Sequence, residues 1–372
     1  MTGYSKAFPA LQQNCCGEFI VPATCSPCST DVPAVPVCVC SHEPVLLPCE
    51  LDGRQLAGFR YGVGQMLFAT TKAIIAEIWR GRDAWAQPSL PFRAWSSGRY
   101  TATGLAQIRN DQAVTTRGGT YLVGVDYSPN EHWTLGALAG YNSVLDSWHE
   151  SISEGRGRFT TGGLYLGWSE KVVEDARRGW FLHLCGYAGP YAGSIRRIPE
   201  CGLCAVSPHS GSAVVLLFEG GYRTHYKGLD CQPFALFSKY HSSHHAFAEH
   251  GSDPSILLCA PKAGGRTWLL EPGFRFATSI TSKHGIVTSP EVIINLAQFL
   301  TSPDNCIECG PCADDKALFV QCIRPYPWTL FEFAAGAKII FWHHGSLHVR
   351  YSMAIGRGFH LGAATVQLSY DF

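Results

Sequence analysis

From about Phe92 to its last residue, the chain alternates apolar and polar positions with a period of two. In the terminal segment "TVQLSYDF", Val366, Leu368, Tyr370 and Phe372 fall on one face and polar residues on the other. This alternation is typical of β-strands. We count about twelve such segments, each close to the 9–11 residues that cross a bilayer as a tilted strand. They begin near residues 92, 118, 133, 158, 180, 212, 232, 267, 286, 328, 346 and 362.

The connections between these segments also alternate. Short turns follow the second, sixth, eighth and tenth segments, and long polar loops with Gly and Cys follow the third, fifth, seventh and ninth. The fourth connection, "SEKVVEDARRG", is a longer exception. Transmembrane barrels combine short periplasmic turns with longer extracellular loops. A soluble sandwich shows the same alternation of faces. The even number of segments, frequent Gly on the polar face, and bracketing aromatics such as Tyr121/Tyr127 and Trp133/Tyr141 favour the barrel.

The region before Phe92 follows a different pattern. Residues 1–53 are rich in Cys and Pro and show little periodicity, whereas residues 54–80 can form one helix, weakened in its first half by Gly58, Gly62 and Gly64. No basic stretch followed by an apolar one opens the chain, so no signal peptide is expected at Met1. We therefore predict an N-terminal Cys/Pro-rich segment at 1–53, a linker helix at 54–85 and a β-domain at 92–372.

Composition narrows the function classes. The formal net charge is +0 and only 16% of residues are charged, so the chain lacks the basic excess with which proteins bind nucleic acid. Sixteen cysteines indicate disulfides in an exported protein and metal sites in a cytosolic one. The spacings "CSPC", "CGLC" and "CIECGPC" fit either chemistry, although the last lacks the fourth Cys of a ferredoxin run.

Several stretches resemble the autotransporter β-barrel domain, the translocator of type V secretion. They are "RAWSSGRY", "GGTYLVGVDYSPNEHWTLGALAGYN", "VLLFEGGYRTHYKGLDCQPFALFSKYHSSHHAFAEHG", "RTWLLEPGFRFATS" and the terminal "QLSYDF". The resemblance covers about residues 54–372. It implies an all-β fold: a twelve-stranded antiparallel transmembrane β-barrel in the bacterial outer membrane, with the N-terminal helix threaded through the lumen. A helix carrying Lys72, Glu77 and Arg80 suits a polar lumen better than lipid.

The resemblance also implies roles for particular residues. Tyr370 and Phe372 would form the membrane-assembly signal that the outer-membrane barrel assembly machinery reads. Two features depart from the family pattern: only about 50 residues precede the helix, and cysteine is unusually frequent. The cysteine content is similar to that of the polymorphic membrane proteins, but their GGA(I/L/V) and FxxN repeats are absent. The chain is thus interpreted as a fragment, a mis-started frame or a barrel without a large passenger.

In such a barrel, lone charges on the polar face would lie in the lumen, either holding the helix or simply solvated. The expected lumen charges are Glu219, Arg223, Glu271, Arg275, Glu332 and Lys338. Export favours disulfides over metal at the loop cysteines. The candidates are Cys201, Cys204, Cys259, Cys306, Cys309, Cys312 and Cys322, whereas Cys185 falls mid-strand on the lumen face. The histidines are expected to be polar rim residues: His241, His244, His245, His343, His344 and His348.

We predict an outer-membrane translocator that inserts by its C-terminal barrel and displays or secretes an N-terminal passenger segment. Its expected partners are outer-membrane lipid, the assembly machinery and other envelope proteins through disulfide crosslinks. No cofactor, metal or catalytic residue is implied. The first alternative is a stand-alone outer-membrane porin or adhesin with disulfide-linked external loops. The second is a soluble Cys-rich β protein with metal sites. An enzyme on the outer rim is the least favoured, because no motif singles out a reactive Ser or His.

Overall fold

The structure is a computed structural model that describes part of the chain. The described residues are 54–78, 91–105, 113–148, 153–170, 179–198, 203–251, 253–283, 285–301, 306–312, 319–322, 328–341 and 344–372. The predicted segment 1–53 and residues 79–85 of the predicted linker helix lie outside them.

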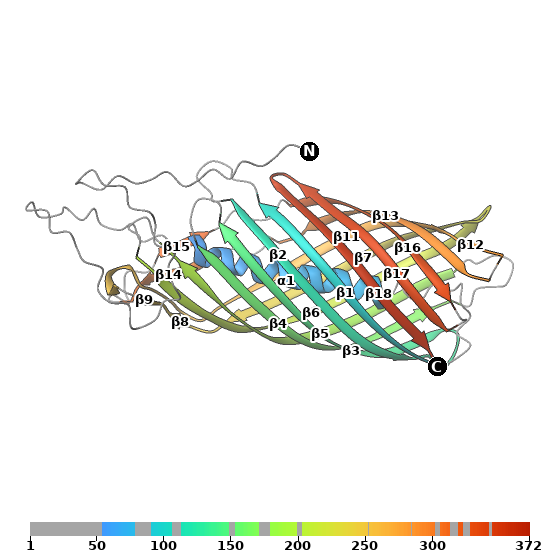
Figure 1. Cartoon of the computed structure of the whole chain (residues 1–372), viewed down its shortest axis with the longest axis horizontal. Coiled ribbons are helices and arrows are strands. Elements are labelled where there is room, and N and C mark those ends of the chain that lie inside the picture. Colours follow the sequence, from blue (N-terminus) through green and yellow to red (C-terminus); the bar gives the residue numbers. More distant parts are fainter. Residues whose placement is uncertain are drawn as a thin grey trace, which may run out of the picture.

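Twelve long antiparallel strands form a closed barrel (Figure 1). They are β1 (Phe92–Leu105), β2 (Val114–Tyr127), β3 (Trp133–Trp148), β4 (Glu154–Ser169), β5 (Gly179–Arg197), β6 (Ala205–Tyr226), β7 (Leu229–His244), β11 (Ala263–Thr278), β13 (Val287–Phe299), β16 (Thr329–Phe341), β17 (Gly345–Gly356) and β18 (Phe359–Asp371). Neighbours in this series pair with each other, including β11 with β13. Two-residue strands β9 (His250–Gly251) and β12 (Ile280–Thr281) extend the sheet at β6 and β13.

The last strand closes the barrel on the first. β18 pairs with β1 from Leu105↔Phe359 to Arg93↔Asp371. Beyond that register, the Phe372 amide donates to the carbonyl of Phe92 at 2.9 Å, and the two rings stack with centroids 6.2 Å apart. Because the chain end is paired to its final residue, no strand edge is left open at this seam, as the bilayer requires.

The alternation seen in the sequence separates the two surfaces of the barrel wall. On β2, Tyr121, Val123, Val125 and Tyr127 are exposed on the outer surface, while Leu122 and Asp126 between them are buried. One turn shows how tightly the strands are joined: Lys227 and Gly228 both have positive φ (48° and 85°) between β6 and β7. Two such residues form the type I′ turn that suits a two-residue hairpin.

A helix, α1 (Arg54–Ile78), runs inside the barrel (blue in Figure 1). Its own apolar side chains are buried there, including Val63, Met66, Leu67, Ile74 and Ile75. Polar side chains of the helix such as Gln65, Thr70 and Thr71 are buried as well, as expected for a helix enclosed by the barrel. Glycine leaves it room at one close approach, because a Cβ on Gly157 would lie 3.2 Å from the Met66 methyl carbon.

Two features of the β-domain differ from the sequence prediction. Several strands begin earlier than expected, most clearly β6, which starts at Ala205 and not near residue 212. The long loops also contain structure, because β8 (Phe247–Ala248), β10 (Leu258–Ala260), β14 (Cys306–Pro311) and β15 (Phe319–Cys322) form a second sheet in the order β15-β14-β10-β8. A 3-10 turn, η1 (Pro254–Ile256), precedes β10. We call this second sheet the loop sheet; it lies at the end of the barrel opposite the C-terminus (Figure 1).

Candidate functional site in the barrel lumen

The lumen is divided into an apolar half and a polar half. Strands β2 to β6 contribute mainly buried apolar side chains: Leu122, Leu138, Val144, Phe159, Tyr187, Tyr191, Val215 and Leu217. Strands β11, β13 and β16 to β18, which we call the polar half, add clusters of charged and amide side chains to buried apolar residues such as Leu269, Ile293 and Leu361. The charged and amide side chains are Glu271, Arg275, Glu291, Asn295, Glu332, Lys338, His348, Arg350 and Gln367. The sequence predicts a polar lumen with lone charges, and the structure adds large buried apolar side chains to it, above all on β2 to β6.

The helix packs against the apolar half. α1 lies in contact with β1 to β5, and it also contacts β14 and β15 of the loop sheet. A few polar contacts fix its rotation: the hydroxyls of Thr71 and Tyr187 lie 2.7 Å apart, and the Tyr187 hydroxyl donates to the carbonyl of Leu67 at 3.1 Å. The Asn142 amide donates to the Thr70 hydroxyl at 3.3 Å. Each contact satisfies a polar atom that burial would otherwise leave costly.

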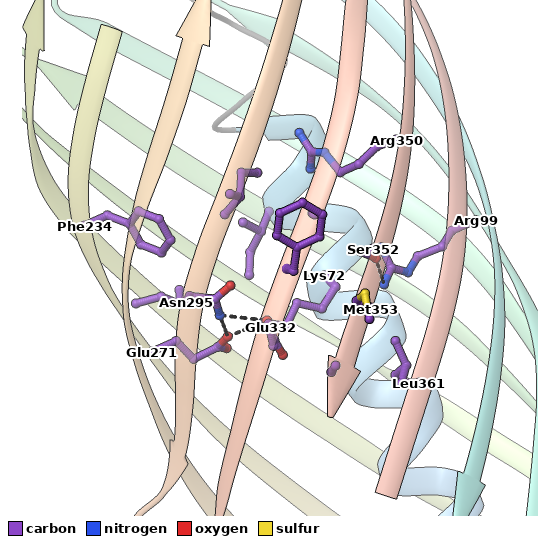
Figure 2. Close-up of a pocket in the computed structure, with 16 residues that line it drawn as sticks. Lys72, Arg99, Phe234, Glu271, Asn295, Glu332, Arg350, Ser352, Met353 and Leu361 are labelled. Carbon is purple, nitrogen blue, oxygen red and sulfur yellow. Dashed lines mark hydrogen bonds and ion pairs between the residues drawn. The ribbon is translucent and has the colours of Figure 1, made fainter. Parts of the chain in front are cut away.

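Across the lumen, Lys72 connects α1 to the polar half. Its ammonium pairs with Glu271 of β11 and, at 2.6 Å, with Glu332 of β16 (Figure 2). The Asn295 amide of β13 donates to both carboxylates, at 3.0 Å to Glu271 and 2.7 Å to Glu332. The Lys72 ammonium also lies 4.9 Å from the centroid of the Phe68 ring. We call Lys72, Glu271, Asn295 and Glu332 the lumen clamp.

The surroundings of the lumen clamp balance its charge. Two carboxylates share one ammonium, which leaves one negative charge in excess, and Arg99 and Arg350 line the same small cavity of about 40 Å³. The Lys72 side chain is 14% exposed and that of Glu271 is 1% exposed. Buried ion pairs contribute little net stability, but losing one partner is expensive because the other charge stays buried and unpaired. The arrangement therefore fixes one position of α1 rather than simply adding stability.

A second network, centred on Glu291 of β13, joins side chains of β11, β17 and β18 to that strand. Arg275 donates to Glu291 at 2.7 Å, and Arg350 donates to the other carboxylate oxygen at 2.8 Å. His348 lies 3.1 Å from Glu291 and 3.1 Å from Gln367. The prediction that His348 is a rim residue is wrong, since strand register turns this side chain into the lumen.

The remaining predicted lumen charges also face inward. Glu219 is buried, with its carboxylate 3.4 Å from a ring nitrogen of His183. Arg223 lines a small cavity with Glu219 and Arg275, and Lys338 is buried in register with His348. Of the six predicted lumen charges, only Glu271 and Glu332 are bound to α1 by ion pairs that the described residues show.

Sequence reasoning missed the central members of both networks. Glu291 and Asn295 share the inward face of β13 with the buried Ile293, and these positions alternate with outward-facing apolar residues such as Ile294 and Leu296. That signal was available in "SPEVIINLAQF". Their partners depend on strand pairing, which places Asn295 opposite Gly273 and Glu332.

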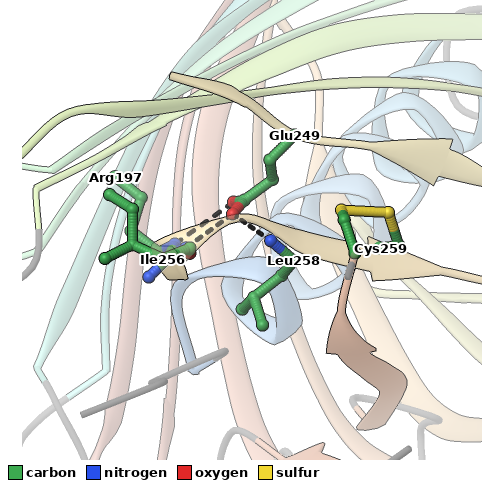
Figure 3. Close-up of a disulfide and its surroundings, with 6 residues drawn as sticks. Arg197, Glu249, Ile256, Leu258 and Cys259 are labelled. Atoms are coloured by element: carbon green, nitrogen blue, oxygen red, sulfur yellow. Dashed lines mark hydrogen bonds and ion pairs between the residues drawn. A yellow bond between two sulfur atoms is a disulfide. The ribbon is translucent and has the colours of Figure 1, made fainter. Parts of the chain in front are cut away.

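The loop sheet is held by an ion pair and a disulfide (Figure 3). Arg197 of β5 donates to Glu249 at 2.5 and 3.1 Å and to the carbonyl of Ile256 at 2.5 Å, while the Leu258 amide donates to Glu249 at 2.8 Å. Both charged side chains are almost fully buried. The bidentate contact thereby ties the loop sheet to the barrel wall.

Cysteines from separate loops meet in the loop sheet. Cys259 and Cys312 form a disulfide with Cα atoms 5.0 Å apart. Cys204 is also disulfide-bonded, and Cys309 is buried. The backbones of Cys306 and Cys322 are paired in β14 and β15, whereas Cys201 lies outside the described residues. Cys185 is buried on the lumen face of β5, with an unbonded thiol.

Neither a metal centre nor a spanning helix is found in the described part of the chain. No group of three or more His, Cys, Asp or Glu side chains is placed there to hold an ion. No described helix is both long and apolar enough to cross a membrane.

These features can be compared with known proteins. The autotransporter β-domain family model matches residues 94–352. The chain belongs to the autotransporter β-domain family. A search of curated proteins finds no match. The polymorphic membrane protein part of the resemblance therefore stays a prediction.

Solved structures with the same fold include three autotransporter domains. The translocator domain of NalP from Neisseria meningitidis is 16% identical, with a TM-score of 0.62 over 87% of this chain and 99% of that one. The β-domain of the Bordetella autotransporter Brka is 14% identical, with a TM-score of 0.58 over 76% and 100%. The transport unit of AIDA-I from Escherichia coli is 14% identical, with a TM-score of 0.56 over 85% and 99%.

Family membership confirms the predicted class, fold and location. This autotransporter barrel is an outer-membrane translocator for a passenger domain. Its twelve strands and internal helix agree with the predicted fold. Autotransporter translocator domains are not enzymes. The domain limits and the roles of individual lumen, terminal and cysteine residues stay predictions.

Proposed function

We propose that this translocator retains its helix in the lumen after export and so anchors the preceding segment at the cell surface. The observation that carries the proposal is the lumen clamp, in which carboxylates of β11 and β16, bridged by Asn295 of β13, pair with one lysine of α1. A helix that only passed through the barrel would need no such residue. With α1 in place, the space beside Lys72 is a cavity of about 40 Å³, room for water but not for a polypeptide.

The barrel is proposed to do no chemistry on its own linker. Release of a passenger by an Asn side chain in the lumen helix needs that Asn, and residues 54–80 contain none. Glu271 and Glu332 could activate a nucleophile, but Lys72 and Asn295 occupy them. The preceding segment is therefore expected to stay covalently attached.

The proposed partners are the barrel assembly machinery, which would read Tyr370 and Phe372, and neighbouring envelope proteins linked through loop disulfides. Tyr370 and Phe372 are about half exposed on the outer surface of the seam, where a binding partner has access to them. The loop cysteines lie at the end of the barrel opposite the C-terminus, where an exported protein meets an oxidising environment.

Single-channel conductance in planar bilayers tests the anchoring proposal against a porin. The wild-type protein should conduct weakly, and a variant lacking residues 1–80 should conduct as an open pore. Lys72→Met should open intermittently, because it leaves α1 in place without the lumen clamp. Lys239→Met, which removes an amine lying over Trp268 on the outer surface, is the matched control and should behave as wild type.

Two results would contradict the proposal. Equal conductance of the wild-type and truncated proteins would show that α1 does not plug the lumen and would favour a stand-alone porin or adhesin. Wild-type behaviour of Lys72→Met would show that packing alone retains the helix.

A further inference from the structure

A basic hollow lies on the outer surface of the barrel, away from the lumen. It has a volume of about 740 Å³ and is lined by Tyr100, Arg117, Gly119, Tyr141, Arg156 and Arg158, among others. We call it the arginine hollow. It opens over strands β1 to β5, the same strands whose inner face packs against α1.

Strand register places these arginines on one face. Arg117 of β2 is opposite Leu145 of β3, which is opposite Arg156 of β4. One step toward the C-terminal end of the barrel, Gly119 is opposite Ser143, which is opposite Arg158. Small residues therefore form the floor between the arginines, and a Cβ added at Gly119 would meet nothing within 4 Å.

The arginines stand at a definite depth in the membrane. Arg117 precedes the girdle residue Tyr127 by ten positions on β2, and Arg158 precedes Trp168 by ten on β4. At about 3.4 Å per residue and a tilt of about 40°, ten positions rise about 26 Å along the membrane normal. The apolar band of such barrels is about 25 Å tall, so both guanidinium groups lie at the height of the outer-leaflet headgroups.

The arginine hollow carries a net positive charge. Glu154 lies 3.5 Å from Arg156, and both side chains are largely exposed. Among the described residues, no carboxylate pairs with Arg117 or Arg158. Charged side chains on the lipid-facing surface are unfavourable near hydrocarbon and are favoured where an anionic headgroup meets them.

We propose that the arginine hollow binds the phosphorylated headgroup of an outer-leaflet glycolipid of the lipid A class. Guanidinium groups bind phosphate oxygens in a bidentate geometry, and those of Arg117 and Arg158 lie on either side of the small residues Gly119 and Ser143. Tyr100 and Tyr141 are about half exposed below the arginines, and Val123, Val125 and Leu164 continue an apolar surface for acyl chains. A soluble anion would gain nothing from that apolar surface. The inference depends on the outer-membrane location but not on how α1 is retained.

Native mass spectrometry of the full chain in detergent, titrated with bis-phosphorylated lipid A, tests the proposal. The variant Arg117→Gln/Arg158→Gln should need at least tenfold more lipid A for half occupancy. Gly119→Leu should weaken binding similarly, because it fills the floor while keeping every charge. Arg266→Gln removes an exposed outward-facing arginine near the matching end of β11, outside the arginine hollow, and should bind as wild type. Gel mobility before and after boiling checks that each variant is folded.

The other ligands distinguish the source of the phosphate. Phosphatidylethanolamine should bind at least tenfold more weakly than lipid A, and inorganic phosphate at millimolar concentration should not displace lipid A. The proposal is overturned if the double variant binds lipid A as the wild type does. It is also overturned if Arg266→Gln loses as much binding as the double variant, or if inorganic phosphate competes with lipid A.

Discussion

Removing the Lys72 ammonium should loosen α1 by an amount that can be calculated from its surroundings. In Lys72→Met, the carboxylates of Glu271 and Glu332 stay buried and keep only Asn295 as a donor among the clamp residues. Breaking a buried pair in this way costs about 3–5 kcal/mol. Since about 1.4 kcal/mol corresponds to a factor of ten, the open state of the helix should become about 10²- to 5,000-fold more populated.

Hydrogen exchange of the α1 amides, followed by mass spectrometry on protein in detergent micelles, measures this population directly. Exchange within residues 54–78 should accelerate by at least about 10² in Lys72→Met, while peptides from the barrel strands keep wild-type rates. Lys239→Met is again the control for an amine lost from the outer surface. Its α1 peptides should exchange as in the wild-type protein.

A triple variant distinguishes the loss of the Lys72 ion pairs from the cost of leaving two carboxylates buried without their cation. Lys72→Met/Glu271→Gln/Glu332→Gln removes all three charges and keeps hydrogen-bonding groups beside Asn295. Replacing a whole buried ion pair by neutral groups is often close to neutral in free energy, so exchange should return to within about tenfold of wild type. The reasoning is refuted if Lys72→Met alone exchanges within about threefold of wild type, or if the triple variant exchanges as fast as the single one.

Three further predictions concern the ends and the loops of the chain. Deleting Phe372, or replacing Tyr370 and Phe372 by Ser, should lower the outer-membrane yield of heat-modifiable protein, and normal assembly of both variants would contradict a terminal signal. Cys259→Ser/Cys312→Ser removes a disulfide between residues 53 apart in sequence and should destabilise the loop sheet by about 2–4 kcal/mol. Hydrogen exchange should become faster in β10 and β14 and stay unchanged in the barrel strands, and unaltered exchange in β10 and β14 would show that the disulfide does not stabilise the loop sheet. Mass spectrometry of protein from outer membranes should find no new N-terminus within residues 54–80, and a discrete cut there without added protease would show that the linker is processed.

The sequence predicts the barrel strands well wherever they cross lipid. β1 and β3 begin at Phe92 and Trp133 as expected, because an interfacial aromatic marks each start. β6 extends seven residues further than expected, through "AVSPHSG". Outside the lipid a strand no longer needs an apolar outer face, so alternation disappears from the sequence while backbone pairing with β5 continues. The loop sheet was not predicted because its strands are too short to show the period-two alternation of apolar and polar residues; β10, for example, has three residues.

Charges in the lumen were predictable as a set but not as pairs. Period-two alternation is enough to turn Glu271, Arg275 and Glu332 inward. Which of them meets Lys72 depends on the rotation of α1 and on the order of strands around the barrel, neither of which a local pattern contains. Glu271 and Arg275 lie on one face of one strand, yet the first binds the helix and the second binds Glu291. Of the two expectations for the lumen charges, contact with the helix thus fits Glu271 and Glu332, whereas Arg275 is neither bound to the helix in this way nor simply solvated, because it pairs with Glu291 of the wall.

The division of the lumen explains how one helix can be held firmly in a channel built for export. If the whole inner wall were apolar, a chain in transit would adhere to it, and if the whole wall were charged, α1 would have nothing to pack against. The apolar half on β2 to β5 gives α1 a surface for Leu67, Ile74 and their neighbours. The polar half keeps most of its charges paired within the wall, around Glu291, and leaves two carboxylates for the helix. Those two meet Lys72 only when α1 has the correct depth and rotation, so the lumen clamp selects one position of the helix in the lumen.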